Sequence, residues 1–386
     1  MIVYIKTQGA KIIKEGRHLL VKKGEDVYNT LFTYKLSQLV LFGNIHFTHS
    51  ALCVLMKNNI DTVFLTQYGR YLGRLASPES KNVFLHKKQY QILEEAEFGL
   101  KLVKNIVSGK LANMSTLMMR IKRSRNSAEA GNKAKQIQNL LAGINTANTI
   151  DSVRGYEGRG SAIYFSGFRH GFTDPTTFTK RIRRPPTDPV NSVLSLLYTF
   201  LMNRVYTAVR IAGLDPYPAF LHTIDYGRYS LVLDLMEEFR SIIVDSLVFS
   251  LFNLKILQKP DFRTEVPVVS GPLAQSSGDC MPDVAADPIG MMTADDAAGE
   301  NFDLPEQRIE MTPATASHVT GKYPVRLQPD AFERVIDAFE KKLTASFYYP
   351  PVERKITYGD AIIYQAAHYR KVIEGEADVY QPLLLK

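Results

Sequence analysis

Short apolar runs, separated by glycine, asparagine and charged residues, mark the first part of the chain. Runs of this kind between turn-forming residues are typical of β-strands. We expect strands at residues 2–5, 19–21, 39–42 and 62–65. Residues 50–57 carry leucine and methionine at helical spacing and predict a short helix between two of these strands. The pattern predicts a small, mostly β domain over residues 1–77.

After Pro78 the apolar residues recur every three or four positions. Between Leu93 and Val107 this spacing forms one face of a long helix. Further helices are expected at residues 114–125, 136–147, 190–212, 229–257, 330–345 and 358–373. The prolines before Asn191 predict a sharp entry to the helix that begins there. The fold class is therefore α+β, in which a larger, all-helical domain over residues 78–386 follows the small N-terminal β domain.

The periodicity is lost over residues 260–320, where proline, glycine, alanine, serine and acidic residues dominate. This composition is typical of a flexible insertion. The stretch from Lys259 to Gly321 contains three basic residues and eleven acidic ones. Its charge could compete with nucleic acid for a basic surface, or the stretch could be a solvated loop. We predict a flexible acidic insertion at 260–320 within the helical domain.

Composition limits the class of protein. The chain has 386 residues, of which 45% are hydrophobic and 22% charged, as in globular proteins. Its two cysteines are too few for a disulfide framework or a thiolate zinc cluster, which fits a reducing cytoplasm. The N-terminus does not have the pattern of a secretory signal. The longest apolar stretch, residues 241–257, is interrupted by Asp245, so we expect no membrane segment.

The charge is distributed unevenly along the chain. The formal net charge is +8, but outside the acidic stretch there are 44 basic and 28 acidic residues, a net charge of +16. Because neutralising phosphates releases counterions, so basic a body favours an extended polyanion as partner. A generic basic surface is the alternative interpretation.

Two common active-site patterns are missing from the sequence. Gly109 and Lys110 lack the upstream glycine spacing of a phosphate-binding loop, and no histidine pair has metalloprotease spacing. Nucleotide hydrolysis and zinc peptidase chemistry therefore lose support.

The region from Leu231 to Arg240 combines carboxylates with a helix that is apolar on nearly every side. Burying Asp234 and Glu237 costs free energy unless a cation compensates each carboxylate. Positions three apart share a helix face, so the two carboxylates should point into the same volume, where a divalent metal could lie. Alternatively, Arg240 forms a simple ion pair with Glu237.

Two other positions could complete such a site. His222 lies in a connection bounded by proline and glycine that leads into the acidic helix. Imidazole can join carboxylates in binding manganese or magnesium, although a lone loop histidine is usually only a hydrogen-bonding residue. Glu157 stands among glycines, which let a phosphate or another backbone approach closely, but it could equally be an acid at a helix start.

Basic residues occur in clusters before the prolines near 185 and elsewhere, and arginine matches phosphate oxygens well. The predicted DNA-binding residues are Lys110, Arg181, Arg183, Arg184, Arg228 and Arg240.

Several motifs together resemble one known family, the CRISPR-associated integrase that forms the larger subunit of the spacer-acquisition complex (the Cas-one family). They are Val40-Leu-Phe-Gly-Asn44, Gly69-Arg-Tyr-Leu-Gly-Arg74, Gly109-Lys-Leu-Ala-Asn113, Tyr156-Glu-Gly158, Arg184-Pro-Pro-Thr-Asp-Pro-Val-Asn191, Gly213-Leu-Asp-Pro216 and Leu233-Asp-Leu-Met-Glu-Glu-Phe-Arg240. Their order and spacing along most of the chain carry the resemblance. The acidic insertion departs from the family, which usually has a much shorter connection there.

The resemblance implies a set of site residues and partners. It puts Glu157, His222 and Glu237 on the family's metal ligands and Asp234 on its additional acidic position beside the metal, with Mg²⁺ or Mn²⁺ as cofactor. It implies double-stranded DNA as substrate, both as a prespacer fragment and as the CRISPR repeat. It also implies a homodimer formed through the β domain, and two dimers bridged by a small partner protein (the Cas-two family) in a heterohexamer.

The reaction implied is attack of a DNA fragment's 3′-hydroxyl on a phosphodiester of the repeat, with metal-stabilised charge in the transition state. Water as nucleophile would instead give endonuclease cleavage. A stand-alone nuclease for branched DNA would use the same residues, and a non-catalytic DNA-binding scaffold would need none of them.

Overall fold

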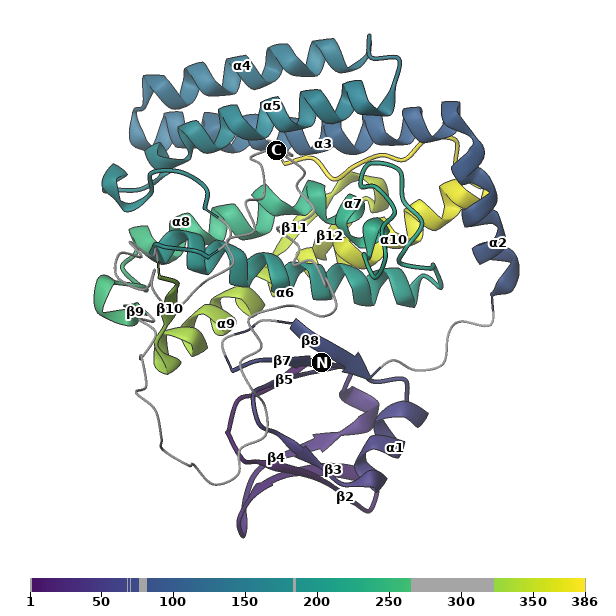
Figure 1. Ribbon diagram of the computed structural model, residues 1–386, viewed down its shortest axis with the longest axis vertical. Coiled ribbons are helices and arrows are strands. Elements are labelled where there is room, and N and C mark those ends of the chain that lie inside the picture. The colour runs from purple at the N-terminus through teal and green to yellow at the C-terminus, as the bar shows by residue number, and fades with distance from the viewer. Residues whose placement is uncertain are drawn as a thin grey trace, which may run out of the picture.

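The N-terminal part of the chain forms two four-stranded sheets (Figure 1). The computed structural model describes residues 2–67, 69, 71–75, 82–182, 185–264 and 323–385. One sheet has the order β1 (Ile2–Ile5), β5 (Gln38–Phe42), β7 (Asp61–Leu65) and β8 (Tyr71–Leu75), in which only β8 is antiparallel to its neighbour. The other has the order β4 (Asp26–Phe32), β3 (His18–Lys23), β2 (Lys11–Glu15) and β6 (His46–Phe47).

The predicted strands at 2–5, 19–21, 39–42 and 62–65 are confirmed, as is the helix at 50–57, which is α1 (His49–Lys57). Strands β2, β4, β6 and β8 were not predicted individually. Side chains from both sheets and α1, among them Ile12, Leu19, Leu39 and Leu55, form a small core.

The first sheet also packs against the helical part of the chain. Val40 and Phe42 on β5 point away from the small core and belong to the main core instead. The Phe42 ring lies 5.0 Å from the ring of Phe332, between centroids. All five residues of β5 are buried, as expected for a parallel strand covered on both faces. One hydrophobic core therefore continues across residue 77, and the division into domains 1–77 and 78–386 stays a prediction.

A polar seam joins the same sheet to the helices. Arg204 donates from Nη2 to Tyr4 Oη (2.7 Å) and from Nη1 to Gln38 Oε1 (3.2 Å), and it also pairs with Glu340. Gln38 in turn donates to Asp61 Oδ2 (2.7 Å). Because Arg204 and Gln38 are buried, these bonds fix the orientation of the sheet on the helices.

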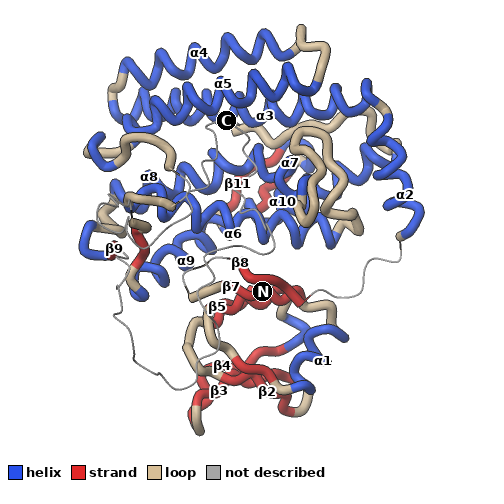
Figure 2. Tube along the Cα trace, in the orientation of Figure 1, coloured by secondary structure: helices blue, strands red, loops and turns tan. Residues whose placement is uncertain are grey.

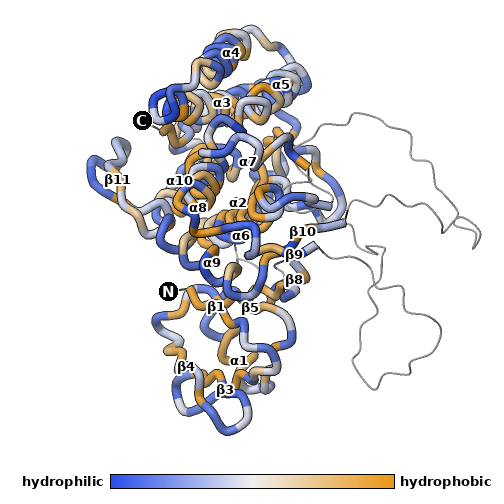
Figure 3. The backbone as a smooth tube through the Cα atoms, turned by 90° about the vertical axis from the view of Figure 1, so that its left-hand side faces the viewer, coloured by the Kyte–Doolittle hydropathy of each residue, from blue (hydrophilic) through white to orange (hydrophobic). Residues whose placement is uncertain are grey.

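Helices dominate the remainder of the described chain, in layers that Figures 1 and 2 show above the sheets. The uppermost layer consists of α3 (Ala96–Arg125), α4 (Ala128–Ile144) and α5 (Ile150–Phe168). The other helices are α2 (Val83–Gln91), α6 (Pro189–Ile211), α7 (Ser230–Phe239), α8 (Ser246–Asn253), α9 (Pro329–Thr344) and α10 (Tyr358–Glu374). Figure 3 shows hydrophobic stretches along α6, α8 and α10 in the middle of the molecule.

Several helix predictions need correction. The stretches at 93–107 and 114–125 form one helix, α3, from Ala96 onward, since no turn interrupts the apolar face; Leu93 lies just before it in a 3-10 turn. Helices α2 and α5 were not predicted, and α5 is the element that carries Glu157. The C-terminal part is mostly rather than entirely helical, because β9 (Phe262–Thr264) pairs with β10 (Val325–Leu327) and β11 (Ser346–Tyr349) pairs with β12 (Arg354–Thr357).

The predicted helix at 229–257 contains a wide turn. Between α7 and α8 the backbone forms a π-helical segment, η5 (Arg240–Asp245). Asp245, at its end, is fully buried and accepts 2.6 Å hydrogen bonds from the hydroxyls of Tyr164 and Tyr198. Such π turns interrupt α-helices most often at functional sites.

Two sequence predictions concern other parts of the chain. None of the described helices is long and apolar enough to cross a membrane. The predicted acidic insertion at 260–320 lies outside the described residues from 265 onward.

Candidate active site

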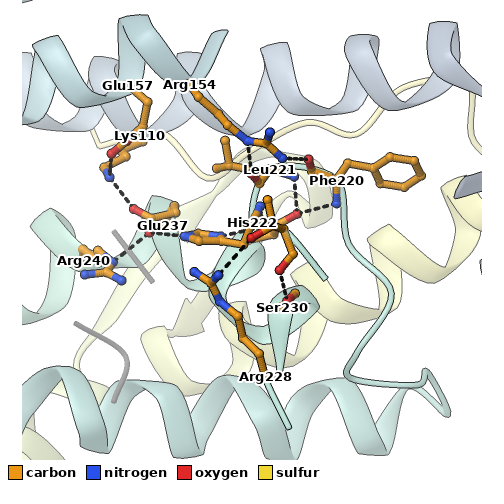
Figure 4. A network of polar contacts seen from close by, with 12 residues as sticks. Lys110, Arg154, Glu157, Phe220, Leu221, His222, Arg228, Ser230, Glu237 and Arg240 are labelled. Atoms are coloured by element: carbon orange, nitrogen blue, oxygen red, sulfur yellow. Dashed lines mark hydrogen bonds and ion pairs between the residues drawn. The ribbon is translucent and has the colours of Figure 1, made fainter. Parts of the chain in front are cut away.

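Four side chains from distant parts of the sequence meet between helices α3, α5 and α7 (Figure 4). Glu157 comes from α5, Glu237 from α7, Lys110 from α3 and His222 from the connection before α7. Lys110 Nζ contacts Glu157 Oε1 and lies 2.6 Å from Glu237 Oε2. His222 Nε2 lies 3.8 Å from Glu237 Oε1. The structure thus brings together three residues that the sequence analysis singled out, around a lysine to which it gave a different role.

Helix α5 places Glu157 beside α3 through close helix packing. Thr149 caps the helix by accepting from the Ser152 N–H, and one turn after Glu157 the backbone of Gly160 faces Leu111. A Cβ at Gly160 would lie 2.4 Å from Leu111 Cδ2, so a larger residue would require the buried Leu111 side chain to shift. Ser161 Oγ donates to Glu157 Oε1 (2.9 Å) and helps to orient the carboxylate.

Glu237 is a buried carboxylate surrounded by cations. Arg240 Nε lies 3.1 Å from Glu237 Oε1, on the opposite oxygen from Lys110. Burial alone would raise the pKa of Glu237, but the charges of Arg240, Lys110 and His222 outweigh it and lower the pKa to about 2. Neither oxygen of Glu237 has a described hydrogen-bond donor of good geometry, so these close ion pairs provide the compensation. The alternative of an ion pair between Arg240 and Glu237 is therefore also confirmed, and both side chains of this pair are buried.

Lys110 stays charged despite its burial, with 2% of its surface exposed. Desolvation lowers the pKa of a buried lysine, but the carboxylates of Glu157 and Glu237 outweigh this effect and raise the pKa of Lys110.

Asp234 holds the other edge of His222. Its Oδ1 accepts from the His222 backbone N–H (2.9 Å) and from Nδ1 of the imidazole (2.7 Å). Its Oδ2 accepts from the backbone N–H groups of Phe220 (3.1 Å) and Leu221 (3.0 Å). Because a carboxylate only accepts, Nδ1 carries the proton and Nε2 faces Glu237. Asp234 and Glu237 thus lie on two sides of the imidazole, rather than in one shared volume.

Hydrogen bonds from α5 and from α7 hold the connection that carries His222. Arg154 on α5 donates from Nε to the Leu221 carbonyl (2.6 Å) and from Nη2 to the Phe220 carbonyl (3.1 Å). Ser230, the first residue of α7, donates to the Thr223 carbonyl (2.9 Å). The backbone around His222 therefore has partners on both its N–H and its carbonyl side, which fixes the imidazole. Sequence analysis did not single out Arg154, since its partners are backbone atoms about 66 residues away.

The donor atoms suit a hard divalent cation. Two carboxylates and an imidazole nitrogen are ligands that magnesium and manganese accept, and a carboxylate on the far ring nitrogen is the usual support for a metal-binding histidine. Within the described part of the chain, no three carboxylate, imidazole or thiol groups meet at metal-binding distances. Glu157 and Glu237 converge on the Lys110 ammonium instead. The residue types fit the ion, and their role as ligands stays a prediction.

The predicted DNA-binding residues differ in their surroundings. Lys110 and Arg240 are buried and paired with Glu237. Arg181 is half-buried and donates to Asn191 Oδ1 (2.8 Å), and Arg228 is half-buried and donates to Thr223 Oγ1 (3.1 Å). Arg183 and Arg184 lie outside the described residues. DNA contact by these residues stays a prediction.

A second buried cluster attaches the last described residues to the site helices. Asn113, one turn after Lys110, donates to the Leu383 carbonyl (2.7 Å) and accepts from the Leu385 N–H (2.7 Å). Glu238, next to Glu237, accepts from Tyr380 Oη (2.7 Å) and the Leu383 N–H. Burial raises the pKa of Glu238 to about 7, although these hydrogen bonds oppose the rise. Nothing in the local sequence of Asn113 or Glu238 indicated these distant partners.

Comparison with known proteins gives a consistent result. The family described as CRISPR associated protein Cas1 matches residues 3–271. The chain is 29% identical to the CRISPR-associated endonuclease Cas1 3 of Thermus thermophilus, over all of this chain and 97% of that protein. It is 34% identical to a Cas1 endonuclease of Chlorobaculum tepidum, over 67% of this chain and 78% of that protein.

Solved structures share the fold. A casposase bound to an integration product matches with a TM-score of 0.76 and 19% identity, over 98% of this chain and 92% of that one. A Cas1 protein from Thermotoga maritima matches with a TM-score of 0.74 and 18% identity, over 98% of this chain and 99% of that one. The resemblance noted in the sequence is confirmed: this chain belongs to the Cas1 family of CRISPR-associated proteins.

Proposed function

We propose that this protein is a metal-dependent DNA endonuclease and integrase that inserts short DNA fragments into a CRISPR array. The observation that carries the proposal is the convergence of Glu157, Glu237 and the Nε2 side of His222, with Asp234 fixing the imidazole. Its relatives in Thermus thermophilus and Chlorobaculum tepidum are named endonucleases, and a casposase of the same fold is bound to an integration product. Both support DNA cutting and joining.

Each site residue has a distinct task in this proposal. Glu157, Glu237 and His222 Nε2 hold Mg²⁺ or Mn²⁺, which supplies positive charge for the phosphate in the transition state. Asp234 keeps the proton of His222 on Nδ1, so that Nε2 presents its lone pair. Arg240 and Lys110 balance the buried carboxylates.

The reaction requires no covalent enzyme intermediate. The 3′-hydroxyl of the fragment attacks the phosphorus of a repeat phosphodiester, and the bond to the neighbouring 3′-oxygen breaks. Water in place of the hydroxyl gives endonuclease cleavage.

The partners belong to the same proposal. The substrates are double-stranded DNA, both the prespacer and the repeat, and the net charge of +16 outside the acidic stretch supports a polyanionic partner. Residues 1–77 form the dimerisation domain and residues 78–386 the catalytic domain. Two homodimers assemble with a small Cas-two-family partner into a heterohexamer. We place the protein in the cytoplasm, where its two cysteines would stay reduced.

The test is joining of a labelled fragment to a repeat-containing plasmid, with the small partner present and with Mn²⁺ or EDTA. Glu157→Ala and His222→Ala should abolish joining and leave DNA binding in place. Glu97→Ala, which removes an exposed carboxylate at the start of α3, is the matched control and should join normally. Undiminished joining by both site variants would refute the site.

Two other outcomes would identify the alternatives. Cleavage of branched DNA without any joining would point to a stand-alone structure-selective nuclease. DNA binding without cutting or joining, unchanged by EDTA, would point to a non-catalytic scaffold.

A further inference from the structure

The position of the Lys110 ammonium is unusual for a lysine. It lies where two carboxylates from different helices converge, in contact with Glu157 Oε1 and 2.6 Å from Glu237 Oε2. Its side chain is only 3% exposed. A divalent ion that both carboxylates bind would need to lie at nearly the same point, because metal–oxygen distances of about 2.0–2.2 Å leave little room elsewhere.

The charges around this point are closely matched. Glu157 and Glu237 contribute two negative charges, and Arg240 already pairs with Glu237 Oε1 from the other side. Without Lys110, the Glu157 carboxylate would face Glu237 with no cation between them. Removing one partner from a buried ion pair is strongly destabilising, because the remaining charge is left uncompensated.

We propose that Lys110 is a built-in substitute for the catalytic metal: its ammonium holds Glu157 and Glu237 together until a divalent ion displaces it. The inference rests on the proposed function, since it takes these two residues as metal ligands. It assigns Lys110 a positioning role, which keeps α3, α5 and α7 assembled in the metal-free protein. Metal binding then exchanges one cation for another and leaves the helices in place.

Thermal unfolding of the purified full-length protein in EDTA and in MnCl₂ tests this exchange. Lys110→Met keeps most of the length of the side chain and removes its charge. In EDTA this variant should melt roughly 5–10 °C below the wild type, because two buried carboxylates face each other. In MnCl₂ its melting temperature should rise by clearly more than that of the wild type. Lys101→Met is the control, at a lysine on the same helix whose Nζ makes only a solvent-exposed 3.2 Å hydrogen bond to the Asp378 carbonyl among the described contacts, and it should behave nearly like the wild type.

A double variant separates charge from packing. Lys110→Met combined with Glu157→Gln removes one charge of each sign, so its melting temperature in EDTA should recover toward the wild type and its response to manganese should be small. If the double variant is as unstable as Lys110→Met, the loss comes from packing and the proposal fails. It also fails if Lys110→Met melts like the wild type in EDTA.

The manganese response distinguishes the two proposals. If the wild type is stabilised by manganese and Lys110→Met gains no more than the wild type, only the exchange is wrong. If manganese stabilises neither protein, the proposed metal site is wrong, and the exchange fails with it.

Discussion

Asp234→Asn is the substitution that most directly tests how His222 is oriented. Asp234 is almost completely buried, with 1% of its surface exposed, and its two oxygens accept four hydrogen bonds. Asparagine has nearly the same shape but offers one acceptor oxygen and one NH₂ group that can only donate. At least one of the three backbone N–H donors must therefore lose its partner, whichever way the amide turns.

The two orientations of the amide have different consequences. If its oxygen faces His222, the N–H groups of Phe220 and Leu221 meet a donor. If its oxygen faces those N–H groups, the His222 backbone N–H loses its acceptor. The amide then donates to Nδ1, which gives up its proton, and Nε2 carries a hydrogen where a lone pair is needed. An unsatisfied buried donor costs about 1–3 kcal/mol, so the loss of one or two partners should lower the unfolding free energy by about 1–6 kcal/mol. Loss of the carboxylate support should weaken metal binding by about 10–100-fold.

Urea denaturation in EDTA measures the first effect, and calorimetric titration with MnCl₂ measures the second. Asp225→Asn, an exposed position three residues after His222, is the matched control and should change neither. If Asp234→Asn keeps the stability and manganese affinity of the wild type, then Asp234 does not fix the tautomer of His222 and the reasoning is wrong.

Three further predictions concern residues outside the proposed metal site. Burial raises the pKa of Glu238 from 4.5 to about 7, so the folded protein favours the protonated carboxyl. The stability that this preference contributes is complete below about pH 4.5 and is lost as pH rises through 7. The wild type should therefore lose about 3 kcal/mol of unfolding free energy between these limits. Glu238→Gln should remove most of this slope when urea midpoints are compared at pH 5 and pH 8. Tyr198→Phe removes a 2.6 Å hydrogen bond to Asp245 and should cost about 1.5–3 kcal/mol by urea denaturation, whereas Tyr226→Phe, at an exposed tyrosine, should cost nothing. Arg204→Met breaks the polar seam and should cost about 2 kcal/mol, because its partner Glu340 is partly exposed; an unchanged urea midpoint would show that the seam does not stabilise the protein.

The β part of the fold was predictable because its signal is local. Apolar runs between turn residues identify β1, β3, β5 and β7 directly. Helix α5 was missed for a tertiary reason. Gly155, Gly158 and Gly160 lower its helix propensity, yet the small size of Gly160 lets the Leu111 side chain of α3 pack against the α5 backbone. Packing against α3 overrides the local preference, and a single sequence does not reveal that packing.

The candidate site was predictable in its residue types and less so in its geometry. The buried carboxylates of Asp234 and Glu237 were identified from the apolar helix around them, but their spacing alone suggested a shared volume. In the folded chain His222 lies between them, because Asp234 turns toward the backbone of the preceding connection. Lys110 stands 47 residues before Glu157 and 127 before Glu237, so its place between them depends on the packing of three helices. No local pattern contains that information.

The wide turn at η5 restricts how the chain length can vary in evolution. Each residue of an α-helix advances the side-chain direction by about 100°. The π-helical segment holds one more residue than a regular helical turn, so deleting one residue between Arg240 and Asp245 would restore a regular helix with little change in direction after it. Deleting a second residue would rotate everything after the deletion relative to Glu237. Asp245 would then turn away from Tyr164 and Tyr198, and a buried carboxylate would lose both of its donors. We therefore expect related sequences to vary in residue type along this segment and to differ in its length by no more than one residue.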